Sequence, residues 1–296
     1  MKRNILTLII AVFALMQAAA QTYDNLWKQA DIIARKDQPR SEIGVMKKII
    51  SKASAAKDYG QLLAAEMRQM ILWKEISADS LMPNVERMEA EVLKVKDPAL
   101  KAVRYAVLGK VYSDMDEKKS EEFFKKALQQ PELLAKHTST EYVPLTLKGV
   151  DGSSFNNDLL HLVGFEADSK EAYHLMYTYY NKVGNRGAAC LCAYKLIEKY
   201  RQDDVREVRK SKYLHTIDSL IHVYQDIPEA GELAVEHFRF MEGATDAKPL
   251  DKLNYINYAL SRWGGWSRMN ELRNAQKRLT EPMFRVKRMP QVLRPG

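Results

Sequence analysis

The sequence has few of the residues and motifs from which catalytic sites are usually built. It contains two cysteines among 296 residues, Cys190 and Cys192. Side chains two positions apart on a helix point in divergent directions, so these thiols cannot bridge each other, and we interpret them as small buried residues. The sequence lacks a glycine-rich phosphate loop, a Gly-x-Ser-x-Gly elbow, a His-Glu-x-x-His zinc helix and a Cys-x-x-Cys pair. We therefore expect no enzyme activity, no catalytic residues and no cofactor.

Long apolar runs are missing after the first 20 residues. Those residues begin with Lys2 and Arg3, continue through an apolar stretch from Ile5 to Met16, and end in Ala18-Ala19-Ala20. This order is typical of a secretory signal peptide, so we predict removal of residues 1–20 and a periplasmic or secreted mature chain. No cysteine lies near the cut to carry a lipid anchor, and no later segment is apolar enough to span a membrane.

The net charge of +8 is concentrated at the two ends of the chain. The signal peptide carries +2, residues 262–296 carry +7, and residues 21–261 sum to −1. A nucleic-acid partner is not expected for an exported protein. The basic end therefore suggests an anionic surface or a neighbouring domain, although a solvated charged face is the more ordinary explanation.

Apolar residues recur at spacings of three and four along most of the mature chain, which predicts amphipathic helices. Two of these stripes are Ile43, Met46, Ile49, Ile50 and Ala53, and Leu100, Val103, Val107, Leu108 and Val111. Helix-start signals lie between the stripes: Asp97 precedes Pro98, and Asp168 with Glu171 has the spacing of a capping box. We predict an all-α fold of stacked antiparallel helix hairpins.

Two of the predicted hairpins resemble the tetratricopeptide repeat, in which large residues of one helix interlock with small residues of the next. Tyr105, Leu108, Gly109 and Tyr112 fit the first helix of one unit. A second unit is matched by Tyr173, Met176, Tyr180, Gly184 and Ala189. The resemblance implies an irregular solenoid, with helical-hairpin regions at 21–130 and 158–281 and an irregular loop at 131–157 between them.

The last residues, 282–296, have a different pattern. Phe284-Arg285-Val286-Lys287 alternates apolar and polar residues with the period of a β-strand. A lone strand is not stable, so we interpret this segment as the start of a possible following β-domain in a longer natural protein. A stop codon directly after Gly296 would contradict that interpretation.

Few residues are candidates for a site. His215, Asp218 and His222 fall on one side of a helix at metal-ligand spacing, but such residues are usually solvated, and we predict no metal site. Trp263 and Trp266 flank a Gly-Gly turn, where they could stack on a ligand, although core packing is the more ordinary role. With the basic residues that follow, the candidate interaction residues are Trp263, Trp266, Arg273, Lys277, Arg278, Arg285, Lys287 and Arg288.

The mature chain also resembles the N-terminal helical region of bacterial alpha-2-macroglobulin-family proteins, which are exported protease traps. The matching segments are Tyr23 to Lys28, Tyr59 to Leu63, Phe155 to His161, Glu171 to Tyr173, Gly184 to Ala189, and Leu272 to Phe284. In that family, β-sandwich domains, a bait segment and often a Cys-x-Glu-Gln thioester follow. Neither cysteine of this chain lies in that motif, so the resemblance does not transfer covalent trapping to any residue here.

These observations favour a non-catalytic interaction module of an exported alpha-2-macroglobulin-like protein. Its expected partners are the downstream β-domains of a longer chain or another envelope protein. The alternative is a free-standing periplasmic helical-repeat protein that binds a peptide or a glycan in a groove lined by aromatic side chains.

Overall fold

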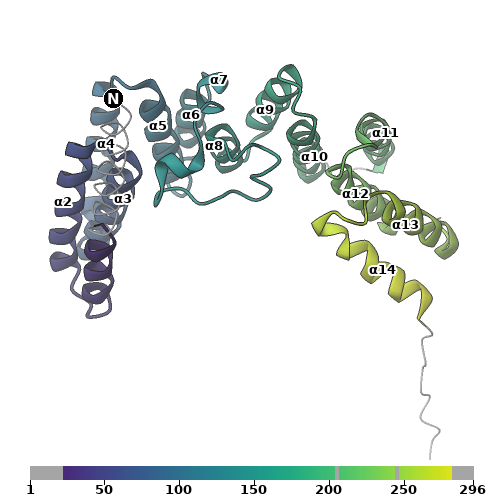
Figure 1. Cartoon of the computed structure of the whole chain (residues 1–296), viewed down its shortest axis with the longest axis horizontal. Coiled ribbons are helices and arrows are strands. Elements are labelled where there is room, and N and C mark those ends of the chain that lie inside the picture. Colours follow the sequence, from purple (N-terminus) through teal and green to yellow (C-terminus); the bar gives the residue numbers. More distant parts are fainter. Residues whose placement is uncertain (1–22, 204–206, 244–246, 282–296) are drawn as a thin grey trace, which may run out of the picture. The chain divides into compact units, whose positions relative to one another are not determined.

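The computed structural model describes residues 23–203, 207–243 and 247–281, without the side chains of Ala78 and residues 202–212 (Figure 1). Within these ranges the fold is all-α, as predicted, and the one β-type contact is an isolated bridge between Thr138 and Asp158. None of the helices in the described ranges is long and apolar enough to cross a membrane. The predicted signal peptide and strand-like segment lie outside the described residues.

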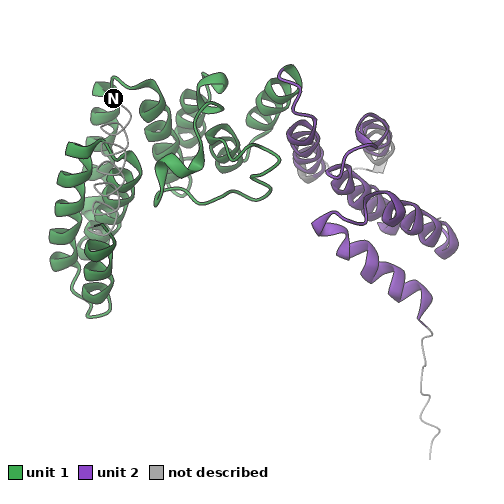
Figure 2. Ribbon diagram, in the orientation of Figure 1, with its two compact units in different colours: residues 1–182 green, residues 183–296 purple. Residues whose placement is uncertain are grey.

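The chain forms two compact units, residues 1–182 and residues 183–296 (Figure 2). Their boundary falls between Lys182 and Val183, inside the range 158–281 that the sequence pattern groups as one helical region. The units are called unit 1 and unit 2 below.

Unit 1 begins with a three-helix core. Residues 23–34 are helical and are followed by α2 (Pro39–Ala56) and α3 (Tyr59–Ile76). The predicted apolar stripe of α2 is buried: Met46, Ile49 and Ala53 have no exposed surface, and they form one cluster with Leu62 of α3. A 3-10 turn, η1 (Ala78–Ser80), then leads to α4 (Leu81–Lys94). Short connections therefore pack successive helices against one another, as the hairpin prediction required.

The pair α5 (Pro98–Tyr112) and α6 (Glu117–Ala127) has the interlocking expected of a tetratricopeptide-like hairpin. Gly109 lies against the ring of Phe124, and an added Cβ at this glycine would be 2.8 Å from the ring. The Ser120 hydroxyl donates a buried hydrogen bond of 2.8 Å to the Gly109 carbonyl. The ring of Phe123 stacks on that of Tyr112, with 5.5 Å between the centroids. A small residue on α5 thus permits close approach of large residues on α6.

The segment between Gln130 and Asp158, predicted as an irregular loop, contains two short helical pieces. These are α7 (Pro131–Leu134) and the 3-10 helix η2 (Ser139–Tyr142). The η2 end of the segment packs closely on α3, since a Cβ on Gly60 would overlap the backbone of Tyr142 and Val143. Most of its remaining residues form turns, some of them with positive φ, such as Asp151 and Asn156.

Unit 1 ends with α8 (Leu159–Ala167) and α9 (Lys170–Lys182). Gly164 of α8 faces the Met176 side chain of α9 so closely that a Cβ there would overlap the sulfur. The predicted capping role of Asp168 is wrong: Ser169 is the residue whose side chain accepts from the Ala172 amide, at 3.1 Å. Asp168 instead adopts a positive φ of 44° and accepts a hydrogen bond of 2.7 Å from the Tyr173 hydroxyl.

Unit 2 contains five α-helices and one 3-10 helix within its described residues: α10 (Arg186–Asp203), α11 (Glu207–Tyr224), α12 (Ala230–Gly243), α13 (Pro249–Trp263), η3 (Ser267–Met269) and α14 (Asn270–Thr280). Helix α12 is the most buried of these, with Leu233, Ala234 and Glu236 fully covered. Cys190 and Cys192 of α10 are buried and form no disulfide, as the sequence predicted. Their helix packs against α11 and α12.

Candidate functional site

A groove of about 660 Å³ lies on unit 1, lined by residues of α6, of α9 and of the end of α8. It is called the α6–α9 groove here. Its apolar side chains come from Phe124 and Leu128 on one wall and from Ala167, Ala172 and Leu175 on the other. Phe124 and Leu128 are each 5% exposed, and Leu175 is half-buried. These five residues together form the apolar floor of the groove, and the small side chains of Ala167 and Ala172 leave room between the helices.

Charged side chains surround this floor. Lys118, Glu121 and Lys125 project from α6, and Glu171 projects from the first turn of α9. All four are exposed, and none forms an ion pair with another described residue. Glu122 differs, because its hydrogen bond of 2.6 Å from Lys126 holds the pKa of its carboxyl below the ordinary value. Both signs of charge are thus available around an apolar surface, which suits an amphipathic polypeptide.

Beneath the turns that precede α8 lies a buried polar cluster. Asp158 caps α8 by accepting from the His161 amide at 2.8 Å, and it also accepts from the Tyr180 hydroxyl at 2.9 Å. The His161 ring stacks on Phe155 with 4.0 Å between centroids, and neither ring nitrogen has a hydrogen-bond partner. Burial raises the pKa of Asp158 to about 6 and lowers that of His161 to about 4. Asp158 is 3% exposed and His161 1%, so neither residue faces a ligand.

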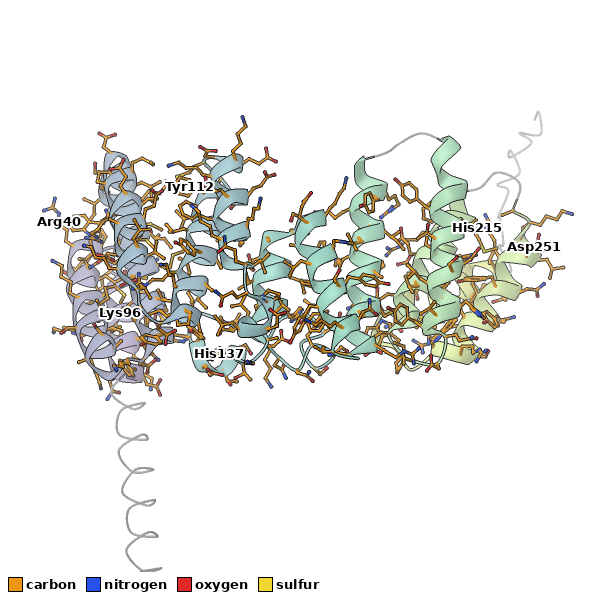
Figure 3. All side chains as sticks on the ribbon, turned by 90° about the horizontal axis from the view of Figure 1, so that it is seen from above. Arg40, Lys96, Tyr112, His137, His215 and Asp251 are labelled. Atoms are coloured by element: carbon orange, nitrogen blue, oxygen red, sulfur yellow. The ribbon has the colours of Figure 1, made fainter. Side chains whose placement is uncertain are left out.

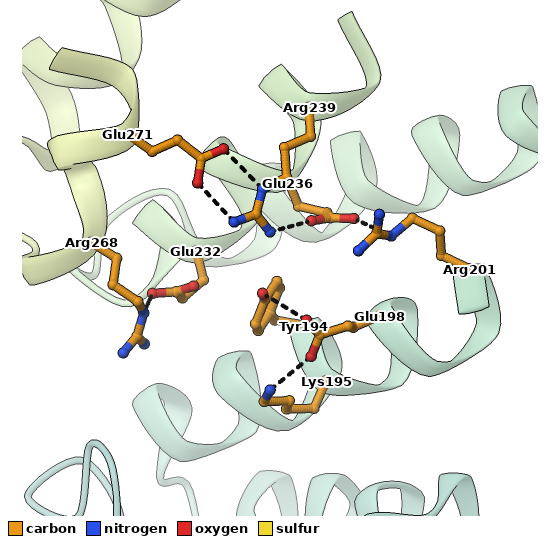
Figure 4. A network of polar contacts seen from close by, with 9 residues as sticks. All are labelled: Tyr194, Lys195, Glu198, Arg201, Glu232, Glu236, Arg239, Arg268 and Glu271. Carbon is orange, nitrogen blue, oxygen red and sulfur yellow. Dashed lines mark hydrogen bonds and ion pairs between the residues drawn. The ribbon is translucent and has the colours of Figure 1, made fainter. Parts of the chain in front are cut away.

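Unit 2 contains a network of ion pairs centred on two buried glutamates of α12 (Figure 4). Glu236 has no exposed side-chain surface, and its carboxylate lies 2.9 Å from Arg201 of α10 and 3.0 Å from Arg239. Arg239 also donates two hydrogen bonds, of 2.9 Å and 2.7 Å, to Glu271 of α14. These hydrogen bonds, chiefly those to Glu271, raise the pKa of the guanidinium above its ordinary value. Glu236 and Arg239 thus link α12 to both α10 and α14.

The second glutamate, Glu232, is also almost fully buried. Its carboxylate accepts a hydrogen bond of 2.5 Å from the Trp266 indole and pairs with Arg268 of η3. Gly231 leaves room for Trp266 to reach Glu232. A Cβ added to Gly231 would lie 3.0 Å from the Trp266 side chain. The charged groups of this network pair with one another, although Glu236 Oε1 has only the ion pair with Arg201 and no hydrogen bond. We therefore interpret the network as one that holds the helices of unit 2 together.

The structure gives four of the eight candidate interaction residues internal partners, and one of them is Trp266, which donates to Glu232. Trp263 is 3% exposed and donates to the Gln225 carbonyl at 3.2 Å, so it packs in the core. Arg273 donates to the Gly264 carbonyl, and Arg278 lies 2.9 Å from Glu242. Lys277 is exposed on α14. Arg285, Lys287 and Arg288 lie outside the described residues.

The three residues at metal-ligand spacing on α11 are not brought together as a site. His215, Asp218 and His222 are all exposed, and Asp218 lies 3.1 Å from His237 of α12. Nowhere in the described parts of the chain do three histidine, cysteine, aspartate or glutamate side chains form a group suited to a metal ion.

The α6–α9 groove was not predicted as a site from the sequence. Helical periodicity identifies the buried face of a helix, but it does not show where two neighbouring helices leave a groove between them.

No family model and no curated protein sequence matches the chain. The crystal structure of BtubC (BKLC) from P. vanneervenii is similar over 87% of this chain and 98% of its own, with 12% sequence identity and a TM-score of 0.30. A likeness with this TM-score supports no inference about the chain.

Proposed function

We propose that this chain is a non-catalytic helical module that binds a polypeptide, as part of an exported protein of the alpha-2-macroglobulin type. The observation that carries the binding role is the α6–α9 groove, with its apolar floor and unpaired rim charges. Its volume of about 660 Å³ lies within the range of about 300–1,000 Å³ that is usual for ligand sites.

The chemistry of the groove favours a polypeptide as its ligand. Leu175, with the small exposed parts of Phe124 and Leu128, offers apolar surface to the anchor side chains of an amphipathic helix. Lys118 and Lys125 would pair with acidic residues of the ligand, and Glu121 and Glu171 with basic ones. Such rim pairs select the partner and its orientation more than they add affinity.

The family assignment rests on sequence. Segments such as Tyr59 to Leu63 and Phe155 to His161 resemble the helical region of alpha-2-macroglobulin-family proteins, and residues 1–20 resemble a signal peptide. In such a protein the ligand of the groove would be a downstream β-domain or another envelope protein. A reading frame that continues past Gly296 into β-rich sequence would support this assignment, and a stop codon there would refute it.

Photo-crosslinking in the producing cell tests the groove itself. A benzophenone amino acid replaces Leu175 in the groove or, as a matched control, Leu93 of α4, which is 69% exposed and does not line the groove. We expect a polypeptide adduct from position 175 that position 93 does not give. Adding Lys125→Glu to the groove probe reverses one rim charge and should weaken that adduct. Equal adducts from both positions, or none from position 175, would refute the binding role.

A further inference from the structure

A second cavity, of about 430 Å³, lies where α3 and α5 begin and where η2 packs against them. It is called the α3–α5 pocket here. Asp58 and Tyr59 line it from the start of α3, and Asp97 lines it from the residue before α5. The segment that holds η2 contributes His137, labelled in Figure 3, together with Glu141 and Tyr142. The pocket is separate from the α6–α9 groove and shares no lining residue with it.

The fixed charges of the pocket are mainly negative. Asp58 and Asp97 each cap a helix through Oδ1, at 3.3 Å from the Gln61 amide and 2.8 Å from the Leu100 amide. Their Oδ2 atoms have no partner among the described residues. Each helix start adds about half a positive charge, which reduces the full charge of its aspartate without cancelling it. Lys57, the one lysine of the lining, is exposed.

Glu141 adds a third carboxylate whose position is fixed. It accepts from the Thr138 amide at 2.8 Å and lies 2.7 Å from Nδ1 of His137. Although burial alone would raise it, the pKa of Glu141 is lowered by these contacts with His137 and Thr138. The carboxylate therefore stays ionised near neutral pH, and it is held in place before any ligand arrives.

Tyr142 gives an independent indication that the pocket takes a ligand. Its side chain is 3% exposed and lines the pocket, yet its hydroxyl has no hydrogen-bond partner among the described residues. Burial, followed by the charges of Asp97 and Glu141, raises the pKa of this hydroxyl far above its ordinary value. The oxygen of this hydroxyl is open to the pocket and has no partner among the described residues, so a donor carried by a ligand would find an acceptor there.

The aromatic rings decide between a cation and an anion. Tyr59 and Tyr142 both line the pocket, and the faces of aromatic rings attract cations. A phosphate bound at the helix starts would face three carboxylates and two rings. The surroundings of the pocket therefore oppose an anion and favour a cation that donates several hydrogen bonds.

We propose that the α3–α5 pocket binds a guanidinium or primary ammonium group carried on an alkyl stem, as in an arginine or lysine side chain. Val143, which is 52% exposed at the pocket, would contact the stem. Leu147 and Val150 continue the same segment and are 83% and 68% exposed, so a polypeptide carrying the cation would find further apolar contacts there. This site goes beyond the proposed function and does not depend on the groove.

The test is a titration of the whole chain with defined probes, in which isothermal calorimetry measures binding. The probes are N-acetylarginine amide, the capped pentapeptide Ala-Val-Arg-Leu-Ala, the same peptide with citrulline in place of arginine, and inorganic phosphate. We expect both arginine probes to bind, and the citrulline peptide to bind at least about tenfold more weakly because it lacks the charge. A pentapeptide much tighter than the free amide would identify a polypeptide as the source of the cation, and equal binding would identify a small amine.

Two pocket variants and one matched control locate the site. Asp97→Asn keeps a good helix cap but removes a charge, and Tyr142→Phe removes the hydroxyl; each should weaken binding of the pentapeptide about three- to tenfold. Asp116→Asn makes the same change at the cap of α6, where Asp116 accepts from the Lys119 amide at 3.1 Å, and should leave binding unchanged.

Several results would overturn the proposal. They are no binding of either arginine probe at millimolar concentrations, equal binding of the citrulline peptide, saturable binding of phosphate at the pocket, or equal weakening by Asp116→Asn. Circular dichroism of each variant checks that it is folded before the titration.

Discussion

The buried residues Asp158 and His161 should change the stability of unit 1 with pH in opposite directions. Burial lowers the pKa of His161 from 6.5 to about 4, an effect that Asp151 opposes. Its stabilising contribution is full above pH 6.5 and is lost as pH falls through 4. Burial raises the pKa of Asp158 from 3.8 to about 6, against the hydrogen bonds from the His161 amide and Tyr180. Its contribution is full below pH 3.8 and is lost as pH rises through 6.

The two contributions are similar in size. A difference of one pH unit between folded and unfolded pKa values corresponds to about 1.4 kcal/mol, so each group contributes about 3 kcal/mol across its range. In the native chain the two effects nearly cancel between pH 4 and 6. Asp158→Asn keeps an acceptor for the His161 amide but removes the aspartate titration, so only the effect of His161 remains. The free energy of unfolding should then rise by up to about 3 kcal/mol between pH 4 and 6, relative to the native chain.

His161→Leu has the reverse effect. It removes an imidazole whose nitrogens have no partners and leaves Asp158 alone, so unfolding free energy should fall by up to about 3 kcal/mol between pH 4 and 6 relative to the native chain. Urea titrations followed by circular dichroism at pH 4, 5, 6 and 7 measure these differences. Parallel curves for the native chain and both variants, or slopes that change in the same direction, would refute this reasoning.

Three further substitutions test the packing by urea or thermal unfolding. Glu236→Ala leaves Arg201 and Arg239 without their shared carboxylate and should cost about 2–3 kcal/mol, because both arginines are partly exposed; an unchanged urea midpoint would contradict this. Phe124→Ala should cost about 3–5 kcal/mol by opening a cavity against Gly109, and a loss below about 1 kcal/mol would mean that the ring is not packed there. Gly164→Ala should cost about 1–3 kcal/mol, measured by melting temperature, because its Cβ overlaps Met176.

The helices could be predicted from the sequence because their signals are local. The stripe from Ile43 to Ala53 fixes which face of α2 is buried, and Asp97 before Pro98 fixes the start of α5, where its side chain caps the helix as expected. The prediction failed where neighbours compete. Asp168 and Ser169 are both good capping residues, and the contact of Asp168 with Tyr173 left the cap to Ser169.

The candidate sites could not be predicted in the same way. The α3–α5 pocket joins Asp58, Asp97 and Tyr142, which are about 40 residues apart from one to the next in the chain. Helical periodicity does not indicate which helices have N-terminal ends that lie side by side in the fold. Trp263 was a candidate interaction residue for which the sequence favoured core packing. Its ring is covered and its nitrogen donates to the Gln225 carbonyl, which agrees with the packing role.

The buried thiols of α10 can serve as probes of the opening of unit 2. Cys190 and Cys192 are completely covered, and burial raises the pKa of the Cys190 thiol. A thiolate-selective reagent therefore modifies them only during openings that expose α10. When reclosing is rapid, the modification rate gives the equilibrium constant for opening. An absorbance assay of thiol modification would then measure how ligands or partners lower that constant for unit 2.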